Sequence, residues 1–220
     1  RVDFERAGAD VHAVQGVRGW CRFVQAMLQH DVIHTHLLKA DAVGALLALG
    51  LGLRSKLIAS KHNDERALLN PWVARVHGVL GNLPQRTIVL SDHVGRFVAE
   101  HGRVDPRRIV RVYYGLDTTA FEAAQAQRQV HRTRVRAELG AAADDFVYIC
   151  IARFAAQKAH DVLLRAFADA HAREPRLRLW LAGDDPFGDG RQRAERLAHE
   201  LQLGSAVRFL GIRRDIPQLL

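Results

Sequence analysis

Residues 146–182 read FVYICIARFAAQKAHDVLLRAFADAHAREPRLRLWLA, and this stretch predicts a strand, a loop, a helix and a second strand. Phe146 to Ile151 is a largely apolar run without alternation, which is typical of a strand buried on both faces. Val162 to Ala170 carries apolar residues at helical spacing, and Leu177 to Ala182 is again largely apolar. Strand, helix and strand in succession predict a parallel sheet with right-handed crossovers.

The same alternation continues on both sides of this stretch, with one break. Between Thr118 and Arg136 the chain is rich in Ala, Gln and Arg and lacks strand propensity. We therefore predict an α/β protein of two doubly wound parallel-sheet lobes: a first lobe at 1–118, a connection at 119–135 and a second lobe at 136–220. The other predicted strands are 31–36, 56–62, 86–90, 108–113 and 206–210.

The composition is that of a folded protein with a basic surface. Hydrophobic residues make up 48% and charged residues 25% of the 220, which excludes the disordered class. A net charge of +8 favours anionic partners such as phosphorylated ligands, an acidic membrane face or nucleic acid. The densest basic stretch, Arg128 to Arg136, has no aromatic residues for base stacking, so we expect no nucleic-acid partner.

Cys21 and Cys150 lie far apart in apolar surroundings, so we interpret both as small buried hydrophobic residues of a cytoplasmic protein. The longest apolar run, Ala42 to Leu53, falls short of the roughly twenty residues of a membrane span and predicts a buried helix. The chain opens at Arg1 in mid-pattern and stops at Leu220 without a helix stop. We therefore expect residues to be missing at both ends and the second lobe to be incomplete.

Residues that follow strands are the first candidates for a site, because ligands of open α/β sheets bind beyond the carboxyl ends of the strands. Arg153 and Lys158 place two cations beside a predicted helix start, an arrangement suited to a diphosphate. The alternative is a pair of solvated loop cations. After the next strand, Gly183 permits close backbone approach, and Asp184 either accepts hydrogen bonds from sugar hydroxyls or caps a turn.

The predicted first lobe contributes further candidates at strand ends. His62 is interpreted as a hydrogen-bond donor to a sugar, with a structural histidine as an equally supported alternative. Gly115 is expected to have a positive φ that turns backbone N–H groups toward a phosphate, or to belong to an ordinary turn. His34 and His36 share one strand face, but no further Asp, Glu or Cys is placed to complete a metal site, so we predict none.

Several segments, taken in order, resemble the retaining glycosyltransferases of family 4, which have the GT-B fold. The resemblance covers roughly residues 30 to 220, and three positions depart from it. Tyr114 stands where the family usually has Asn, and Ala152 and Ala159 stand where it often has Gly. The segments that carry the resemblance are DVIHTH (31–36), IASKH (58–62), IVLS (88–91), YGLD (114–117) followed by Phe121, ARFAAQK (152–158), LAGD (181–184) and VRFLG (207–211).

The resemblance implies a first lobe that holds the acceptor and a second lobe that holds a nucleotide diphosphate-sugar. It implies that Arg153 and Lys158 neutralise charge on the departing diphosphate without a metal, and that His62 donates a hydrogen bond to the transferred sugar. The donor-binding residues that it implies are Arg153, Lys158, Gly115, Gly183 and Asp184. The residues that it places in the crevice of the acceptor lobe are His36, Ser91 and Asp117.

The expected activity is that of a retaining, hexosyltransferase-type enzyme that moves a sugar to a glycan or lipid-linked acceptor, as in bacterial cell-envelope polysaccharide biosynthesis. We expect no cofactor besides the nucleotide-sugar co-substrate, and a cytoplasmic location with peripheral contact to the inner membrane face. The 220 residues stop before the family's acidic Glu-x7-Glu segment, so we expect them alone to be weakly active or inactive. The alternatives are a non-catalytic nucleotide-binding module of the same fold and a sugar-nucleotide 2-epimerase.

Overall fold

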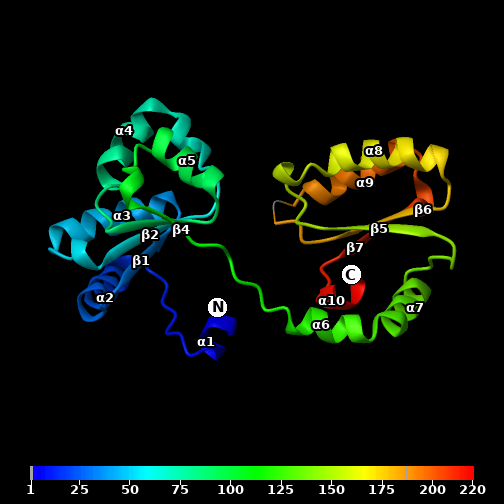
Figure 1. Ribbon diagram of the computed structural model, residues 1–220, viewed down its shortest axis with the longest axis horizontal. Helices are drawn as coiled ribbons and strands as arrows, with labels where there is room; N and C mark the ends of the chain where they lie inside the picture. The colour runs from blue at the N-terminus through cyan, green and yellow to red at the C-terminus, as the bar shows by residue number, and fades with distance from the viewer. Residues whose placement is uncertain (1, 187) are drawn as a thin grey trace. The chain divides into compact units, whose positions relative to one another are not determined.

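The computed structural model describes residues 2–186 and 188–220. The chain forms two compact units, Arg1–Gly115 and Leu116–Leu220 (Figure 1). Each unit is built around its own parallel sheet, as the alternation of strands and helices predicts.

The first unit contains a four-stranded parallel sheet in the order β1-β2-β3-β4. Helices α3, α4 and α5 lie on one face of this sheet (Figure 1), and α2 packs at the β1 edge through its buried Met27. The strands are β1 (Ile33–His36), β2 (Leu57–Lys61), β3 (Arg86–Val89) and β4 (Ile109–Arg111). The helices are α1 (Val2–Arg6), α2 (Gly16–Gln29), α3 (Leu38–Gly50), α4 (Pro71–Leu80) and α5 (Asp92–Glu100), with 3₁₀ turns η1 (Arg54–Lys56), η2 (Arg66–Leu69) and η3 (Pro106–Arg108).

Local capping explains where two of these helices begin. The side chain of Asn70 accepts hydrogen bonds from the backbone N–H groups of Trp72 and Val73, and Pro71 occupies the first helical position of α4. Ser91 caps α5 in the same way by accepting a bond from the N–H of Val94.

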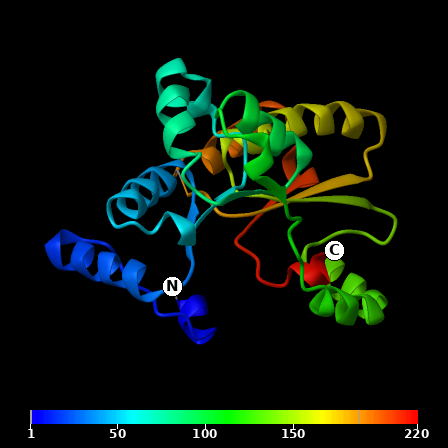
Figure 2. The same ribbon diagram turned by 60° about the vertical axis from the view of Figure 1, so that its left-hand side comes forward.

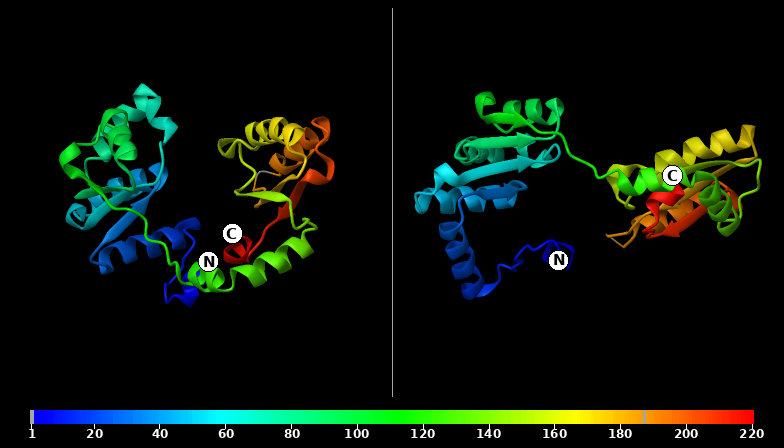
Figure 3. Two further views of the ribbon diagram at one scale, coloured as in Figure 1. Left: turned by 45° about the vertical axis from the view of Figure 1, so that its right-hand side comes forward. Right: turned by 60° about the horizontal axis from the view of Figure 1, so that its bottom comes forward.

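The second unit contains a three-stranded parallel sheet in the order β5-β6-β7. Figure 2 and Figure 3 show α8 and α9 on one face of this sheet and α6, α7 and α10 on the other. The strands are β5 (Phe146–Ile151), β6 (Leu177–Ala182) and β7 (Val207–Gly211). The helices are α6 (Thr119–Ala126), α7 (Arg128–Glu138), α8 (His160–Arg173), α9 (Gly190–Glu200) and α10 (Ile216–Leu219), with 3₁₀ turns η4 (Ala156–Lys158) and η5 (Gly204–Ala206).

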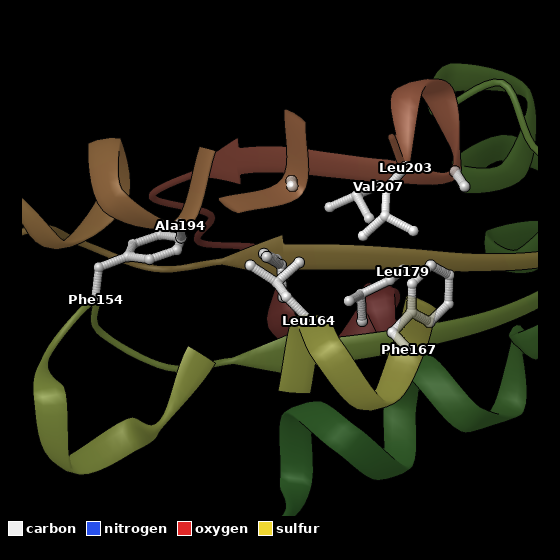
Figure 4. Packing of buried hydrophobic residues seen from close by; sticks show 10 residues of the cluster. Phe154, Leu164, Phe167, Leu179, Ala194, Leu203 and Val207 are labelled. Atoms are coloured by element: carbon white, nitrogen blue, oxygen red, sulfur yellow. The ribbon is translucent and has the colours of Figure 1, made fainter. Parts of the chain in front are cut away.

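Strand β6 is buried on both faces. Side chains alternate along a strand, so its successive residues reach the cores on opposite sides of the sheet. Leu179 and Leu181 pack against Leu164 of α8 and Ala194 of α9 (Figure 4). Trp180 points to the other face and joins a second cluster with Val135, Leu139 and Leu219. This two-sided burial is the physical reason for the largely apolar sequence of the strand.

Each of the seven predicted strands is present in the described residues, with ends shifted by at most two positions. The two-lobed α/β fold class is therefore confirmed. The division at residues 118 and 135 stays a prediction. The structure adds that 119–135 are helical and pack with the second unit, because Val135 of α7 contacts the cluster around Trp180.

Three expectations about burial are corrected. Strand β5, expected to be buried on both faces, is an edge strand of its sheet with three of its six residues exposed. Cys21 is exposed, because Phe23 and Met27 point to the core and Cys21 lies on the other side of α2. The apolar run that begins at Ala42 forms most of α3, but only one side of this helix is buried. None of the helices in the described residues is long and apolar enough to cross a membrane.

Candidate functional site

A group of histidines lies at the carboxyl ends of β1 and β2. The register pairs His36 with Ser60, and His62 follows two residues later on the same face. His36 Nδ1 lies 2.8 Å from His62 Nε2, and the two rings are nearly parallel with their centroids 5.1 Å apart, so they meet edge to edge. The structure thus brings together two residues that the sequence predicts for the site. Their roles stay predictions.

Tyr114, which follows β4, closes this group on the other side. Its hydroxyl is hydrogen-bonded to Nδ1 of His62, and the two ring planes are 22° apart with their centroids separated by 5.8 Å. His34 joins through Ser60, whose hydroxyl lies 2.7 Å from His34 Nε2. Burial, followed by the nearby His36 and His62, lowers the pKa of His34, which therefore favours its neutral form.

The backbone next to this group is strained. Leu37, directly after His36, has a φ of 74° and a ψ of 152°, a region that is essentially restricted to glycine. Strain of this kind tends to cluster at functional sites, which supports the choice of His36 as a candidate. The metal hypothesis for His34 and His36 gains no support, because the described residues contain no group of three His, Cys, Asp or Glu that fits a metal ion.

A buried ion cluster anchors the segment that carries His62. Lys61 is only 2% exposed, and its Nζ lies 2.6 Å from Asp41 and 3.0 Å from Glu65. The other carboxylate oxygen of Glu65 accepts a bond from the backbone N–H of Leu38. This cluster ties the end of β2 to the start of α3, and our sequence analysis missed it. The sequence feature that could have indicated the burial of Lys61 is the alternation along β2, which turns Lys61 to the face opposite His62.

The other predicted site residues near β3 and β4 are Ser91, Gly115 and Asp117. Ser91 uses its hydroxyl to cap α5. Gly115 does not have the expected positive φ, because residues 112–118 contain no turn. Asp117 belongs to the second unit, where its carboxylate accepts bonds from the hydroxyl and N–H of Thr119. These two bonds lower the pKa of Asp117.

In the second unit, the loop after β5 is fixed by its backbone. The N–H of Ala152 donates to the carbonyl of Ala182, and the N–H of Phe154 donates to the carbonyl of Asp184. A Cβ at Gly183 would lie 2.0 Å from the carbonyl oxygen of Ala152, and one at Gly190 would lie 2.2 Å from that of Phe154. The two glycines therefore allow the loop to lie directly against the end of β6 and the start of α9.

We expect Gly183→Ala to lower the free energy of unfolding of the second unit by at least about 2 kcal/mol, because the new methyl group meets rigid backbone. Urea unfolding followed by the fluorescence of the buried Trp180 measures this. Gly115→Ala is the control, since its Cβ meets nothing within 4 Å. Equal stability of both variants with the unsubstituted chain contradicts the packing described for this loop.

Arg153 and Lys158 lie on this loop, and both are exposed. Neither side chain forms an ion pair with another described residue. Lys158 ends η4, two residues before the first residue of α8. Lys158 thus lies near a helix N-terminus, which attracts anions, and Arg153 lies earlier on the same loop. That they converge on one ligand stays a prediction.

The predicted Asp184 is exposed next to Gly183, and one of its oxygens accepts a bond from the N–H of Asp185. Asp185 in turn accepts bonds from the N–H groups of Gly188 and Arg191 at the start of α9. The turn interpretation therefore accounts for Asp185, and the role of Asp184 toward a ligand stays a prediction. A groove of about 550 Å³ next to this loop is lined by Phe154, Ala155, Ala156, His160, Asp161, Gly190, Arg193, Ala194 and Leu197.

Ala159, between Lys158 and α8, has a left-handed conformation with a φ of 50°. Alanine is strained there and glycine is not. We expect Ala159→Gly to raise the free energy of unfolding of the second unit by about 0.5–1 kcal/mol. Thermal unfolding checks the sign. A control is Ala172→Gly in the helical region of α8, where the same change should destabilise. Destabilisation at both positions contradicts this account.

Family models of known proteins match both units of the chain. Residues 5–120 match the family model described as Glycosyltransferase Family 4, and residues 131–220 match the one described as Glycosyl transferases group 1. Two proteins named D-inositol 3-phosphate glycosyltransferase are similar. The one from Geodermatophilus obscurus is 28% identical, over 86% of this chain and 46% of its own length. The one from Nocardioides sp. is 31% identical, over 84% of this chain and 44% of its own length. The chain spans about half the length of the curated relatives it matches.

Solved structures share the fold. Anabaena HepE, crystallised with UDP and glucose, is 23% identical with a TM-score of 0.82, over 99% of this chain and 60% of that one. An alpha,alpha-trehalose-phosphate synthase (UDP-forming) from Burkholderia vietnamiensis is 15% identical with a TM-score of 0.68, over 99% of this chain and 56% of that one. Identities this low show the fold alone.

Proposed function

Since the chain belongs to glycosyltransferase family 4, we propose that the intact protein moves a sugar, with retention, from a nucleotide diphosphate-sugar to a glycan or lipid-linked acceptor. The observation that carries this proposal is the pair of exposed, unpaired cations, Arg153 and Lys158, on a loop fixed by Gly183 and Gly190. A diphosphate needs such charges, and a loop held by rigid backbone presents them without reorganisation.

In the proposed reaction, Arg153 and Lys158 neutralise the charge that grows on the leaving diphosphate. Arg153 offers a planar pair of donors for two oxygens, whereas Lys158 offers a movable point charge. His62 donates a hydrogen bond to the transferred sugar. The new bond forms on the face that the leaving group vacates, so the proposal needs no protein general base, and the two cations perform the neutralisation without a metal.

The names of similar proteins support the donor class. Anabaena HepE was crystallised with UDP and with UDP-glucose, and the trehalose-phosphate synthase is described as UDP-forming. The curated relatives are named for D-inositol 3-phosphate, a phosphorylated polyol. The net charge of +8 also suits an anionic acceptor or an anionic membrane face. We therefore include phosphorylated polyols among the acceptors to test, and we propose a cytoplasmic protein with peripheral membrane contact.

The test is to incubate the intact protein with UDP-, GDP- and ADP-sugars, with and without glycan, lipid-linked and phosphorylated polyol acceptors. A transferase releases nucleoside diphosphate faster when its acceptor is present and yields a glycosylated product that mass spectrometry identifies. An epimerase converts the sugar nucleotide without any acceptor, and a binding module binds nucleotide without turnover. Either of the last two results rejects the transferase proposal.

A further inference from the structure

Tyr114 occupies the position where the resemblance to the family implies Asn, and it contacts the histidine assigned to the transferred sugar. It lies in the irregular segment after β4, and its hydroxyl is bonded to Nδ1 of His62. An asparagine side chain at this position offers neither an aromatic face nor a phenolic hydroxyl. The contact of the Tyr114 ring and hydroxyl with His62 therefore depends on the tyrosine at this position.

Both ring nitrogens of His62 are engaged. Nδ1 meets the hydroxyl of Tyr114, and Nε2 meets Nδ1 of His36 at 2.8 Å. The ring of His62 is nearly parallel to that of His36, at 8°, and close to parallel to that of Tyr114, at 22°. His62 is thus held edge to edge between two nearly parallel rings, with one polar contact at each nitrogen.

The chemistry of these groups determines which nitrogen carries the proton. A neutral imidazole has one N–H donor and one acceptor nitrogen. A phenol is a better proton donor than a neutral imidazole, so the hydroxyl of Tyr114 donates to Nδ1 of His62. The N–H of His62 then lies on Nε2 and donates to Nδ1 of His36. Without the hydroxyl, nothing in this contact favours Nε2–H over Nδ1–H.

We propose that Tyr114 is a positioning residue that holds His62 in the Nε2–H tautomer and fixes the plane of its ring. This inference rests on the proposed function, because it concerns the residue that donates to the sugar. A sugar hydroxyl that accepts the Nε2–H replaces His36 as acceptor, while Tyr114 keeps the donor nitrogen and the ring in place. Tyr114 itself acts through His62.

The experiment compares Tyr114→Phe with Tyr113→Phe in the intact protein. Tyr114→Phe keeps the aromatic ring and removes only the hydroxyl. Tyr113 is the matched control, since it is an exposed neighbour whose ring lies under the Arg111 guanidinium, 4.7 Å away, and not on His62. Nitrogen NMR of histidine-labelled protein reports the tautomer, and the His62 signals are identified by their loss in His62→Gln.

We expect Tyr114→Phe to shift His62 toward the Nδ1–H tautomer and to lower kcat about three- to tenfold, the scale of one neutral hydrogen bond. Tyr113→Phe should change neither quantity. An unchanged tautomer or an unchanged kcat in Tyr114→Phe overturns the inference. The NMR measurement needs no donor or acceptor, so it decides about Tyr114 even if the protein transfers no sugar, a result that rejects the proposed function separately.

Discussion

Lys61→Met is expected to lower the free energy of unfolding of the first unit by about 3–5 kcal/mol. Lys61 is almost fully buried between Asp41 and Glu65, and methionine fills a similar volume without the charge. The change leaves two carboxylates close together in a poorly solvated place, where an unpaired charge is costly. Urea unfolding followed by circular dichroism, with hydrogen exchange at the β2 amides, measures the loss in this unit.

Two controls separate the lost ion pair from the lost side chain. Lys39→Met removes an exposed lysine from α3 and should change stability by less than about 0.5 kcal/mol. Combining Lys61→Met with Asp41→Leu and Glu65→Gln removes the unpaired charges and should restore most of the stability. A single Lys61→Met variant as stable as the Lys39→Met control contradicts the account of this cluster.

Arg153→Ala and Lys158→Ala are each expected to lower kcat for sugar transfer by about 10²- to 10³-fold, the cost of removing one preorganised group that stabilises developing charge. Both side chains are exposed and unpaired, so neither substitution should change stability by more than about 0.5 kcal/mol. Initial rates at saturating donor, with thermal unfolding of each variant, measure both quantities.

The matched control is Arg173→Ala, which removes an exposed arginine from the last turn of α8, at the other end of the helix from Lys158. It lowers the net charge by the same amount and should leave kcat unchanged. Equal losses in all three variants point to a general charge effect rather than to a specific site, and they contradict the role given to the cation pair.

The strands were predictable because their burial follows from a local pattern. β6 reads as a largely apolar run, and the structure covers it with helices on both faces. β5 reads the same way and is a strand, but as an edge strand it leaves three of its six residues exposed. Gly183 was singled out because a glycine at a strand end permits close backbone approach, and the Ala152 carbonyl is the group it approaches. In each case the information lies within a few neighbouring residues.

The rest of the candidate site depends on contacts between residues far apart in the sequence. Tyr114 contacts His62, which is 52 positions away in the sequence, and Lys61 forms an ion pair with Asp41, which is 20 positions away. No local pattern predicts either pairing. The positive φ expected at Gly115 is wrong for a related reason: glycine permits such a conformation, but only the surrounding fold decides whether the chain uses it.

The central claim, that Arg153 and Lys158 bind the diphosphate of the donor, is tested most directly by calorimetric titration of UDP, GDP and ADP into the intact protein. The account predicts that one of these nucleotides binds, that each alanine variant weakens its affinity at least about tenfold, and that Arg173→Ala leaves it unchanged. Equal affinity in the unsubstituted protein and both variants, or no binding of any of the three, contradicts it.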